Sequence, residues 1–216
     1  MNELSWLIID GCHHQTHDSI LFNNSNPKPF IQAFKAAGII TIHKCVTIRH
    51  ALSAERYGVD IISLDGMECA GHPGEDDIGN FVLQAKGAKA LTVPYLCSGG
   101  VGTGNQLAAA LALGADGVMM GTRFCATQEC NWPESYKERM VAADETDTVL
   151  MLRRLQNTCR VFRNDIATKV KHIEATKGAD FHFTDVAHLV SGKRWRAAEK
   201  KGDPDDGIWS AGQVIG

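Results

Sequence analysis

The chain has 216 residues, of which 44% are hydrophobic and 22% charged, and its formal net charge is -3. This length supports one substantial core in an ordinary globular composition, and the weak negative charge excludes the basic footprint of a nucleic-acid-binding protein. Seven cysteines without a CxxC pair favour a reduced intracellular protein over a disulfide framework or a zinc site. Because no apolar run approaches the length of a membrane span and the N-terminus lacks the features of a signal peptide, the expected location is cytoplasmic, with no membrane partner.

The first 26 residues have an irregular pattern. Residues 4–9 can form a strand or a short buried helix, and residues 19–22 a short strand. Between them lie His13, His14 and His17. The HxxxH spacing suits a metal ion on a helix, but the surrounding Asn, Ser, Thr and Gln residues favour turns. We therefore expect no metal site.

From residue 27 onward, apolar β-branched runs alternate with amphipathic segments. Thr47 can cap the first turn of a helix, and Gly58 can end its last turn. Such alternation implies parallel strands with helical crossovers, and both a doubly wound sheet and a (β/α)8 barrel satisfy it. Strands are expected at residues 39–43, 60–64, 94–97 and 117–120, and helices at residues 29–37, 48–57 and 104–113 and within residues 78–86.

The pattern changes at residue 131, after which it predicts helices without intervening strands. The basic run at residues 193–201 is more typical of a solvated helix face than of a phosphate-binding strip. A turn-rich stretch at residues 202–207 then leads into a short apolar segment. The three helices are expected at residues 133–143, 147–157 and 164–175.

The strand expected at residues 60–64 opens into a loop at residues 65–77, Asp-Gly-Met-Glu-Cys-Ala-Gly-His-Pro-Gly-Glu-Asp-Asp. Loops at the C-terminal ends of parallel strands carry the chemistry of α/β folds. His72, in the middle of this loop, is a candidate proton carrier because the ordinary pKa of histidine lies near neutrality. Gly71 and Gly74 allow tight turns or a close approach to a ligand. A solvated loop with an inert histidine is the alternative.

Two further strand ends are rich in glycine and hydroxyl groups. Ser98, Gly99 and Gly100 follow one expected strand, and Met120-Gly-Thr122 follows the next. Either loop alone is explained as a tight turn. Two such loops in successive units favour a bound phosphate, because the loops after the last two strands of a (β/α)8 barrel form its phosphate site.

Together these stretches resemble the nitronate monooxygenase family, formerly called 2-nitropropane dioxygenases, which are FMN-dependent TIM barrels. The resemblance covers residues 27–216 and includes His43-Lys44-Cys45, the loop at residues 65–77 and Trp209-Ser-Ala-Gly-Gln213. It implies an incomplete (β/α)8 TIM barrel with its C-terminal strands present, since a complete barrel needs eight strands. The expected domains are a partial barrel at residues 1–130, a small helical subdomain at residues 131–201, and a linker that returns to the barrel at residues 202–216.

The resemblance also implies a role for each matching residue. His72 is expected to act as the active-site base or to position the substrate over the flavin. Lys44 is expected at the flavin ring or ribityl chain. The flavin is lined by Asp65, Ala70 and Gly71, and its phosphate is bound by Gly99, Gly100, Met120, Gly121 and Thr122.

The implied reaction is the FMN-dependent oxidation of alkyl nitronates by O2 to a carbonyl compound and nitrite. The spelling Glu-Cys-Ala-Gly-His-Pro-Gly-Glu-Asp-Asp (68–77) is also similar to the branch of the family that reduces quinones with NADH, which is the nearest alternative. A flavin-free isomerase of phosphorylated sugars and an inactive fragment of the enzyme are the others. Because the first barrel strands are expected to be absent, we expect the chain alone to be poorly soluble and to carry little FMN.

Overall fold

The computed structural model describes residues 19–22 and 27–216. The expectations for residues 4–9 and for His13, His14 and His17 lie outside the described residues. The chain divides into two compact units, each of which is described by itself. We call residues 1–66, 78–98 and 103–119 the sheet unit, and residues 67–77, 99–102 and 120–216 the hairpin unit.

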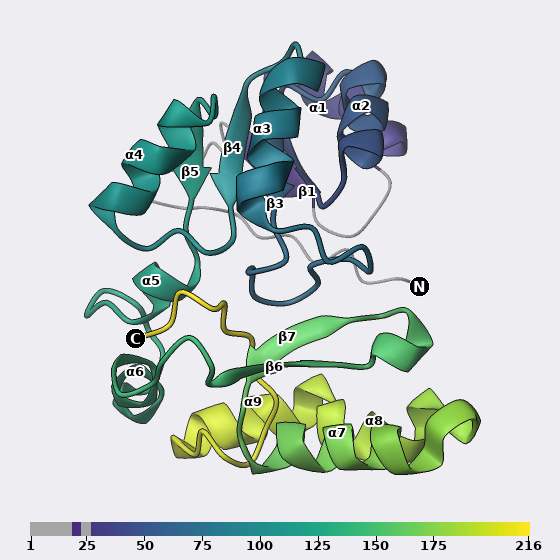
Figure 1. The fold of residues 1–216 in the computed structure, drawn as a ribbon, viewed down its shortest axis with the longest axis vertical. Coiled ribbons are helices and arrows are strands. Elements are labelled where there is room, and N and C mark those ends of the chain that lie inside the picture. Colours follow the sequence, from purple (N-terminus) through teal and green to yellow (C-terminus); the bar gives the residue numbers. More distant parts are fainter. Residues whose placement is uncertain (1–18, 23–26) are drawn as a thin grey trace. The chain divides into compact units, whose positions relative to one another are not determined.

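The sheet unit contains a parallel sheet whose described strands follow one another in chain order, β1-β2-β3-β4-β5 (Figure 1). In a doubly wound sheet the order reverses at a switch point, whereas here every crossover steps to the next position in the same direction. This is the winding of a (β/α)8 barrel, and in the described part of the chain the sheet is not closed. The expected incomplete barrel is confirmed. The strands are β1 (Ser19–Phe22), β2 (Ile40–Cys45), β3 (Ile61–Asp65), β4 (Tyr95–Ser98) and β5 (Gly117–Met119).

The helices of the sheet unit fill the crossovers where the sequence predicts them. Thr47 caps α2 by accepting a hydrogen bond from the His50 backbone N–H at 3.2 Å, and Gly58 ends that helix with a φ of 90°. Thr103 and Gln106 form a capping box at the start of α4. These local signals explain why the bounds differ from expectation by only a few residues. The helices are α1 (Lys28–Ala36), α2 (Ile48–Tyr57), α3 (Asn80–Ala90) and α4 (Gly104–Ala112).

The two faces of the sheet differ in chemistry. Ile62 and Leu64 of β3 are fully buried, and a Cβ built on Gly87 of α3 would lie 2.8 Å from Leu64 Cδ2, so this face packs against the helices. Ser63 and Asp65 alternate with these residues and therefore point to the opposite face. The apolar face supplies the core, and the polar face carries the candidate site residues of this unit.

The hairpin unit departs from the expectation of helices alone. Residues 148–162 form an antiparallel hairpin, β6 (Thr148–Met151) and β7 (Cys159–Phe162), with a 3-10 turn, η1 (Arg153–Leu155), between the strands. The helix expected at residues 147–157 is wrong. Leu152 and Gln156 have φ values of 61° and 50°, which no α-helix accommodates. A short apolar run does not distinguish strand from helix by its pattern.

The remaining elements of the hairpin unit are helical. The helices expected at residues 133–143 and 164–175 are confirmed as α6 and α7, and Asn164 caps α7 through its side chain. The three-part domain division expected from the sequence stays a prediction. The helical elements are α5 (Thr122–Cys125), α6 (Glu134–Val141), α7 (Asp165–Lys177), η2 (Gly178–Asp180), α8 (Phe183–Val190) and α9 (Gly192–Lys201).

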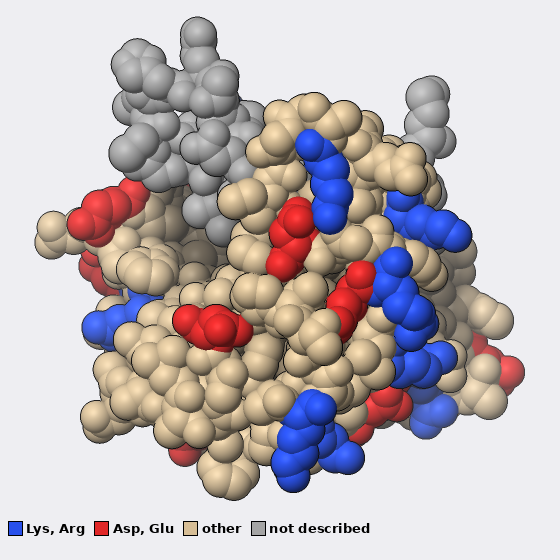
Figure 2. Space-filling model, turned by 90° about the horizontal axis from the view of Figure 1, so that it is seen from above, with Lys and Arg blue, Asp and Glu red and all other residues tan. Residues whose placement is uncertain are grey.

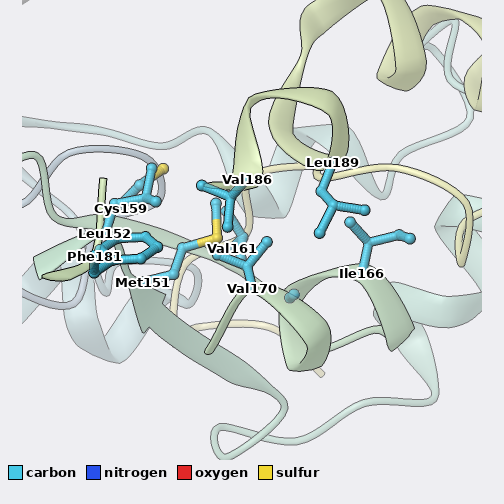
Figure 3. Close-up of a cluster of buried hydrophobic side chains, with 10 residues drawn as sticks. Met151, Leu152, Cys159, Val161, Ile166, Val170, Phe181, Val186 and Leu189 are labelled. Carbon is cyan, nitrogen blue, oxygen red and sulfur yellow. The ribbon is translucent and has the colours of Figure 1, made fainter. Parts of the chain in front are cut away.

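Two clusters of buried side chains stabilise the hairpin unit. In the first, Val161 of β7 lies beside Val170 of α7 and Val186 of α8, and all three are fully buried (Figure 3). In the second, Trp209 stacks on Phe162 with ring centroids 4.4 Å apart. The hairpin thus packs against two parts of the chain that follow it, the helices α7 and α8 and the C-terminal segment around Trp209.

On the face shown in Figure 2, acidic and basic side chains lie close to one another between larger uncharged areas. Within the described part of the chain, no helix is both long and apolar enough to cross a bilayer.

Candidate active site

In the sheet unit, Lys44 and Asp65 stand at the carboxyl ends of neighbouring parallel strands, where α/β folds place their ligands. Lys44 Nζ lies 3.5 Å from Asp65 Oδ2, and the two side chains are only 9% and 7% exposed. Ser63 Oγ donates a hydrogen bond to Asp65 Oδ1 at 2.7 Å. The sequence predicted both charged residues, and the structure joins them in a buried ion pair.

Burial dominates the electrostatics of this pair. It raises the pKa of the Asp65 carboxyl, against the opposing effects of Lys44 and of the hydroxyl groups of Ser63 and Ser98. Burial, followed by the nearby Asp65 carboxylate, raises the pKa of the Cys45 thiol to about 12. Cys45 is therefore a neutral packing residue and not a nucleophile, because only a thiolate reacts.

In the hairpin unit, the loop that carries His72 pairs with the hairpin. Gly71 and Arg160 exchange both backbone hydrogen bonds, at 3.0 Å and 2.6 Å. The Arg160 guanidinium also donates to the Met67 carbonyl oxygen through Nε at 3.2 Å and Nη2 at 3.0 Å, and to Thr148 Oγ1 at 3.0 Å. His72, which is partly buried, directly follows the paired Gly71.

The acidic end of the same loop is attached to the hairpin by two carboxylates. Glu75 accepts hydrogen bonds from the backbone N–H of Thr158 at 2.9 Å and from its hydroxyl at 2.5 Å. Asp77 accepts two hydrogen bonds from the Arg153 guanidinium, at 2.9 Å and 2.6 Å, and this contact lowers the pKa of the Asp77 carboxyl. Both carboxylates therefore anchor the loop.

Gly99 and Gly100 lie directly on this loop, with φ values of 81° and 72°. A Cβ on Gly99 would be 2.7 Å from Cys69 Cβ and 2.9 Å from the Cys69 backbone nitrogen, and one on Gly100 would be 3.0 Å from Glu68 Cβ. The close backbone approach that the sequence indicated is therefore made to the loop itself. Their expected role at a phosphate stays a prediction.

The strand end at residues 120–122 meets the C-terminal segment. Thr122 Oγ1 accepts a hydrogen bond from the Gly212 backbone N–H at 2.9 Å, and a Cβ on Gly212 would lie 3.3 Å from the Ala70 backbone nitrogen. A Cβ on Gly121 would meet nothing within 4 Å, and the Gly121 carbonyl accepts a hydrogen bond from the Cys125 backbone N–H at 3.0 Å. Met120 precedes Gly121.

Each unit therefore holds part of the predicted set. Lys44 and Asp65 belong to the sheet unit, and the other predicted site residues belong to the hairpin unit. Among the described residues, no group of three or more His, Cys, Asp or Glu side chains is arranged to hold a metal ion.

Sequence reasoning missed two supporting residues. Ser63 precedes Asp65 by two positions in a strand, so the two-residue period of side-chain direction places both on one face and could have identified it. Arg160 had no such signal, because its partner Met67 is 93 residues away and the sequence pattern around it predicts helices alone.

Comparisons with known proteins agree with this architecture. The family model for nitronate monooxygenase matches residues 9–216. A probable nitronate monooxygenase of Bacillus subtilis is 35% identical over 131 residues, 57% of this chain and 38% of the relative. A carboxyl-CoA dehydrogenase of Rhodococcus jostii, which acts on a methyl-oxo-octahydroindene carboxyl-CoA, is 32% identical over 174 residues, 80% of this chain and 49% of the relative. The chain thus spans about half or less of these relatives.

Solved structures extend the similarity over most of the chain. FabK from Thermotoga maritima superposes with a TM-score of 0.83 at 33% identity, covering 92% of this chain and 61% of the other. Nitroalkane oxidase from Streptomyces ansochromogenes gives a TM-score of 0.75 at 30% identity, covering 92% and 58%. On the match of the family model over residues 9–216, the chain belongs to the nitronate monooxygenase family, a family of oxidoreductase enzymes.

Proposed function

We propose that the chain forms the active-site part of a flavin-dependent oxidoreductase that binds FMN and oxidises alkyl nitronates with O2. In this reaction one O2 converts two nitronate anions into two carbonyl compounds and two nitrite ions, so atoms and electrons balance without a further reductant. The observation that carries the proposal is the family match over residues 9–216, which includes every residue with an assigned role. FMN, when bound, supplies the electron-accepting chemistry, and the protein binds and orients the reactants.

The chemistry of the chain's own residues fits an FMN site. Lys44 supplies a buried cation at a strand end for the ring or ribityl chain, held by Asp65. Gly121 has open space on its Cα, where an added Cβ would meet nothing within 4 Å, and it is proposed to let a phosphate approach the backbone. Thr122 uses only the acceptor side of its hydroxyl towards Gly212, so its hydrogen remains able to donate to the same phosphate. Asp65, Ala70, Gly71, Gly99, Gly100 and Met120 complete the proposed lining.

His72 is proposed to be the base, or the residue that orients the nitronate. Its support is its place after Gly71, whose backbone is paired on both its N–H and its carbonyl. A catalytic side chain needs such a fixed backbone, because small displacements from the productive geometry cost large factors in rate.

The quinone reductase reaction is the second candidate, and the spelling of residues 68–77 favours it. The structure accounts for part of that spelling in another way, since Glu75 and Asp77 anchor the loop. Two steady-state assays separate the candidates. One follows oxygen uptake with a nitronate, and the other follows NADH oxidation with benzoquinone.

The test is His72→Ala in the purified protein. We expect bound flavin to stay constant while kcat/KM for the nitronate falls about 10²–10⁴-fold, the usual contribution of an acid–base residue. His188→Ala, on the exposed face of α8, is the control and should keep full activity. Unchanged nitronate turnover in His72→Ala would remove His72 from the mechanism.

A further inference from the structure

The loop at residues 67–77 has no regular secondary structure apart from its bridge to β7, yet both of its ends and its middle are bonded to one hairpin. Met67 accepts from Arg160 at the start of the loop, and Gly71 pairs with Arg160 in its middle. Glu75 and Asp77 bind Thr158 and Arg153 at its end. Loops with few such bonds move readily, so this arrangement restrains a segment that would otherwise be mobile.

Arg160 is the centre of this arrangement. It is 4% exposed, and its guanidinium bonds to a backbone carbonyl and a hydroxyl, with no ion pair to any of the described carboxylates. Burying a charge that makes no ion pair is unfavourable unless its hydrogen bonds are well satisfied, and the Glu68 and Asp77 carboxylates act on Arg160 only through longer-range attraction. A neutral side chain would fill the same space without that cost. The presence of a guanidinium here is explained by its several N–H donors, which bond to Met67 and Thr148.

Arg160 contacts both ends of the short segment from Met67 to Gly71. Its side chain fixes the Met67 carbonyl, where the loop begins, and its backbone fixes Gly71, immediately before His72. Arg160 therefore fixes the backbone both at the start of the loop and directly before His72.

A second line of contacts supports the far end of the loop. Glu174 of α7, whose side chain is 5% exposed, accepts hydrogen bonds from the backbone N–H groups of Leu152 at 3.2 Å and Arg154 at 2.9 Å. These bonds hold η1, the turn that carries Arg153, which in turn binds Asp77. The hairpin is thus itself fixed before it fixes the loop.

We propose that Arg160 is a positioning residue for His72, which it holds through paired backbone at Gly71 and a forked hydrogen bond to Met67. The inference rests on the proposed function of His72 for its effect on rate, but not for its effect on the loop. Its predicted signature is a fall in kcat at nearly constant KM, because the proposed flavin and phosphate contacts lie on other residues.

The experiment uses Arg160→Lys, which keeps the charge but loses the fork, together with two controls. Arg163→Lys changes an exposed arginine directly after β7 that donates to the Thr146 and Thr148 carbonyls and not to the loop. Val170→Ala removes a fully buried core contact of α7. It controls for a general loss of stability that leaves the contacts of the loop unchanged. Hydrogen exchange at the Gly71 amide and steady-state kinetics with the nitronate are measured on all three.

In Arg160→Lys we expect at least a 10-fold faster exchange at Gly71 and a 10- to 100-fold lower kcat, with KM changed less than 3-fold, taking one lost hydrogen-bond fork as about one to two factors of ten. Both controls should keep kcat. Faster exchange with unchanged kcat, or an equal loss of kcat in Val170→Ala, would overturn the positioning role.

Failure of the proposed function is seen separately. If His72→Ala keeps full nitronate turnover, the proposed role of His72 fails, and the exchange rate of Gly71 then decides alone whether Arg160 holds the loop. Should Arg160→Lys not fold, Thr148→Val removes one acceptor of the guanidinium and should show the same changes to a smaller degree. Unchanged exchange and kcat in that folded variant would contradict the proposal.

Discussion

Lys44 and Asp65 are placed by a parallel sheet, whereas Gly71 and His72 are placed by an irregular loop. In the sheet unit the backbone ladder fixes the ends of β2 and β3, so neighbouring strands bring the two charges together, and the Ser63 hydroxyl adds a hydrogen bond to Asp65. In the hairpin unit, the position of the loop depends on side chains that are 76 to 93 residues away in the sequence.

This difference determines what a substitution does in each unit. A change at Lys44 or Asp65 alters the charge of the site and leaves the strand ends in place. A change at Arg160 alters no proposed ligand contact but releases the backbone that carries His72. The substitutions below test this contrast, and those that affect stability are given in order of decreasing effect.

Lys44→Met should have the largest effect on stability, because it leaves the Asp65 carboxylate buried without its partner. Breaking a buried pair in this way costs about 3–5 kcal/mol. Lys44→Met combined with Asp65→Asn should recover most of the loss. Denaturant unfolding of the single and double variants measures both values, and an undiminished loss in the double variant would show that the pair is not the cause.

The same variant should be pH-dependent in a defined direction. Burial already raises the pKa of Asp65 in the folded protein, and loss of Lys44 raises it further. A folded-state pKa above the unfolded value means that the folded state binds the proton more tightly, so stability falls as pH rises through that interval. The deficit of Lys44→Met should therefore be small at acid pH, where Asp65 is neutral in both states, and largest at neutral pH.

Gly99→Ala should destabilise the hairpin unit by about 1–3 kcal/mol, the usual cost of an L-residue in a strained backbone conformation. The added methyl group would also meet the backbone of Cys69 at 2.9 Å. Gly104→Ala, at the start of α4, meets nothing within 4 Å and should be neutral. Thermal unfolding compares the two variants, and equal midpoints would contradict the close packing of Gly99 on the loop.

Gly114 is not a neutral control, although the sequence indicates only the end of a helix there. Its φ is 102°, and an added Cβ would lie 2.7 Å from the Ala88 Cβ. Gly100→Val and Gly114→Ala both strain a backbone of positive φ and a close Cβ contact, so a larger loss of flavin in Gly100→Val supports the proposed phosphate role and an equal loss contradicts it.

Thr47→Ala should lower stability by about 1 kcal/mol, because the α2 cap loses its side-chain hydrogen bond to the His50 N–H. The effect should be confined to the sheet unit and leave exchange at Gly71 unchanged. Hydrogen exchange across both units measures this, and faster exchange in the His72 loop would show that the two units do not respond separately.

Asp77→Asn should have the smallest effect, about 0.2–1 kcal/mol, because Asp77 and Arg153 are both exposed. Arg153 lowers the pKa of the Asp77 carboxyl, so the contribution is present above the ordinary carboxyl pKa and is lost as pH falls through the lowered folded-state value. Urea midpoints of the two proteins should therefore converge in acid. A constant difference down to that pH would exclude the ion pair as the source.

The sequence alone determined the elements whose signals are local. The cap at Thr47, the glycine at the end of α2 and the apolar run of β3 each act within one or two turns of chain, so α2 and β3 were predicted to within one residue. The loops after β3, β4 and β5 were recognisable as candidate site loops for the same reason, since strand ends and glycines are adjacent in the sequence.

Only the tertiary structure decided the hairpin and what it holds. Leu152 adopts a positive φ because the buried carboxylate of Glu174 accepts hydrogen bonds from this turn. The sequence around Leu152 contains no signal that predicts this partner. Arg160 likewise gains its role from Met67 and Gly71, which a strand pairing brings to it. Local pattern specifies where a strand ends, but contacts between distant segments specify how the loop beyond it is held, because the energy that selects one loop conformation comes from those contacts.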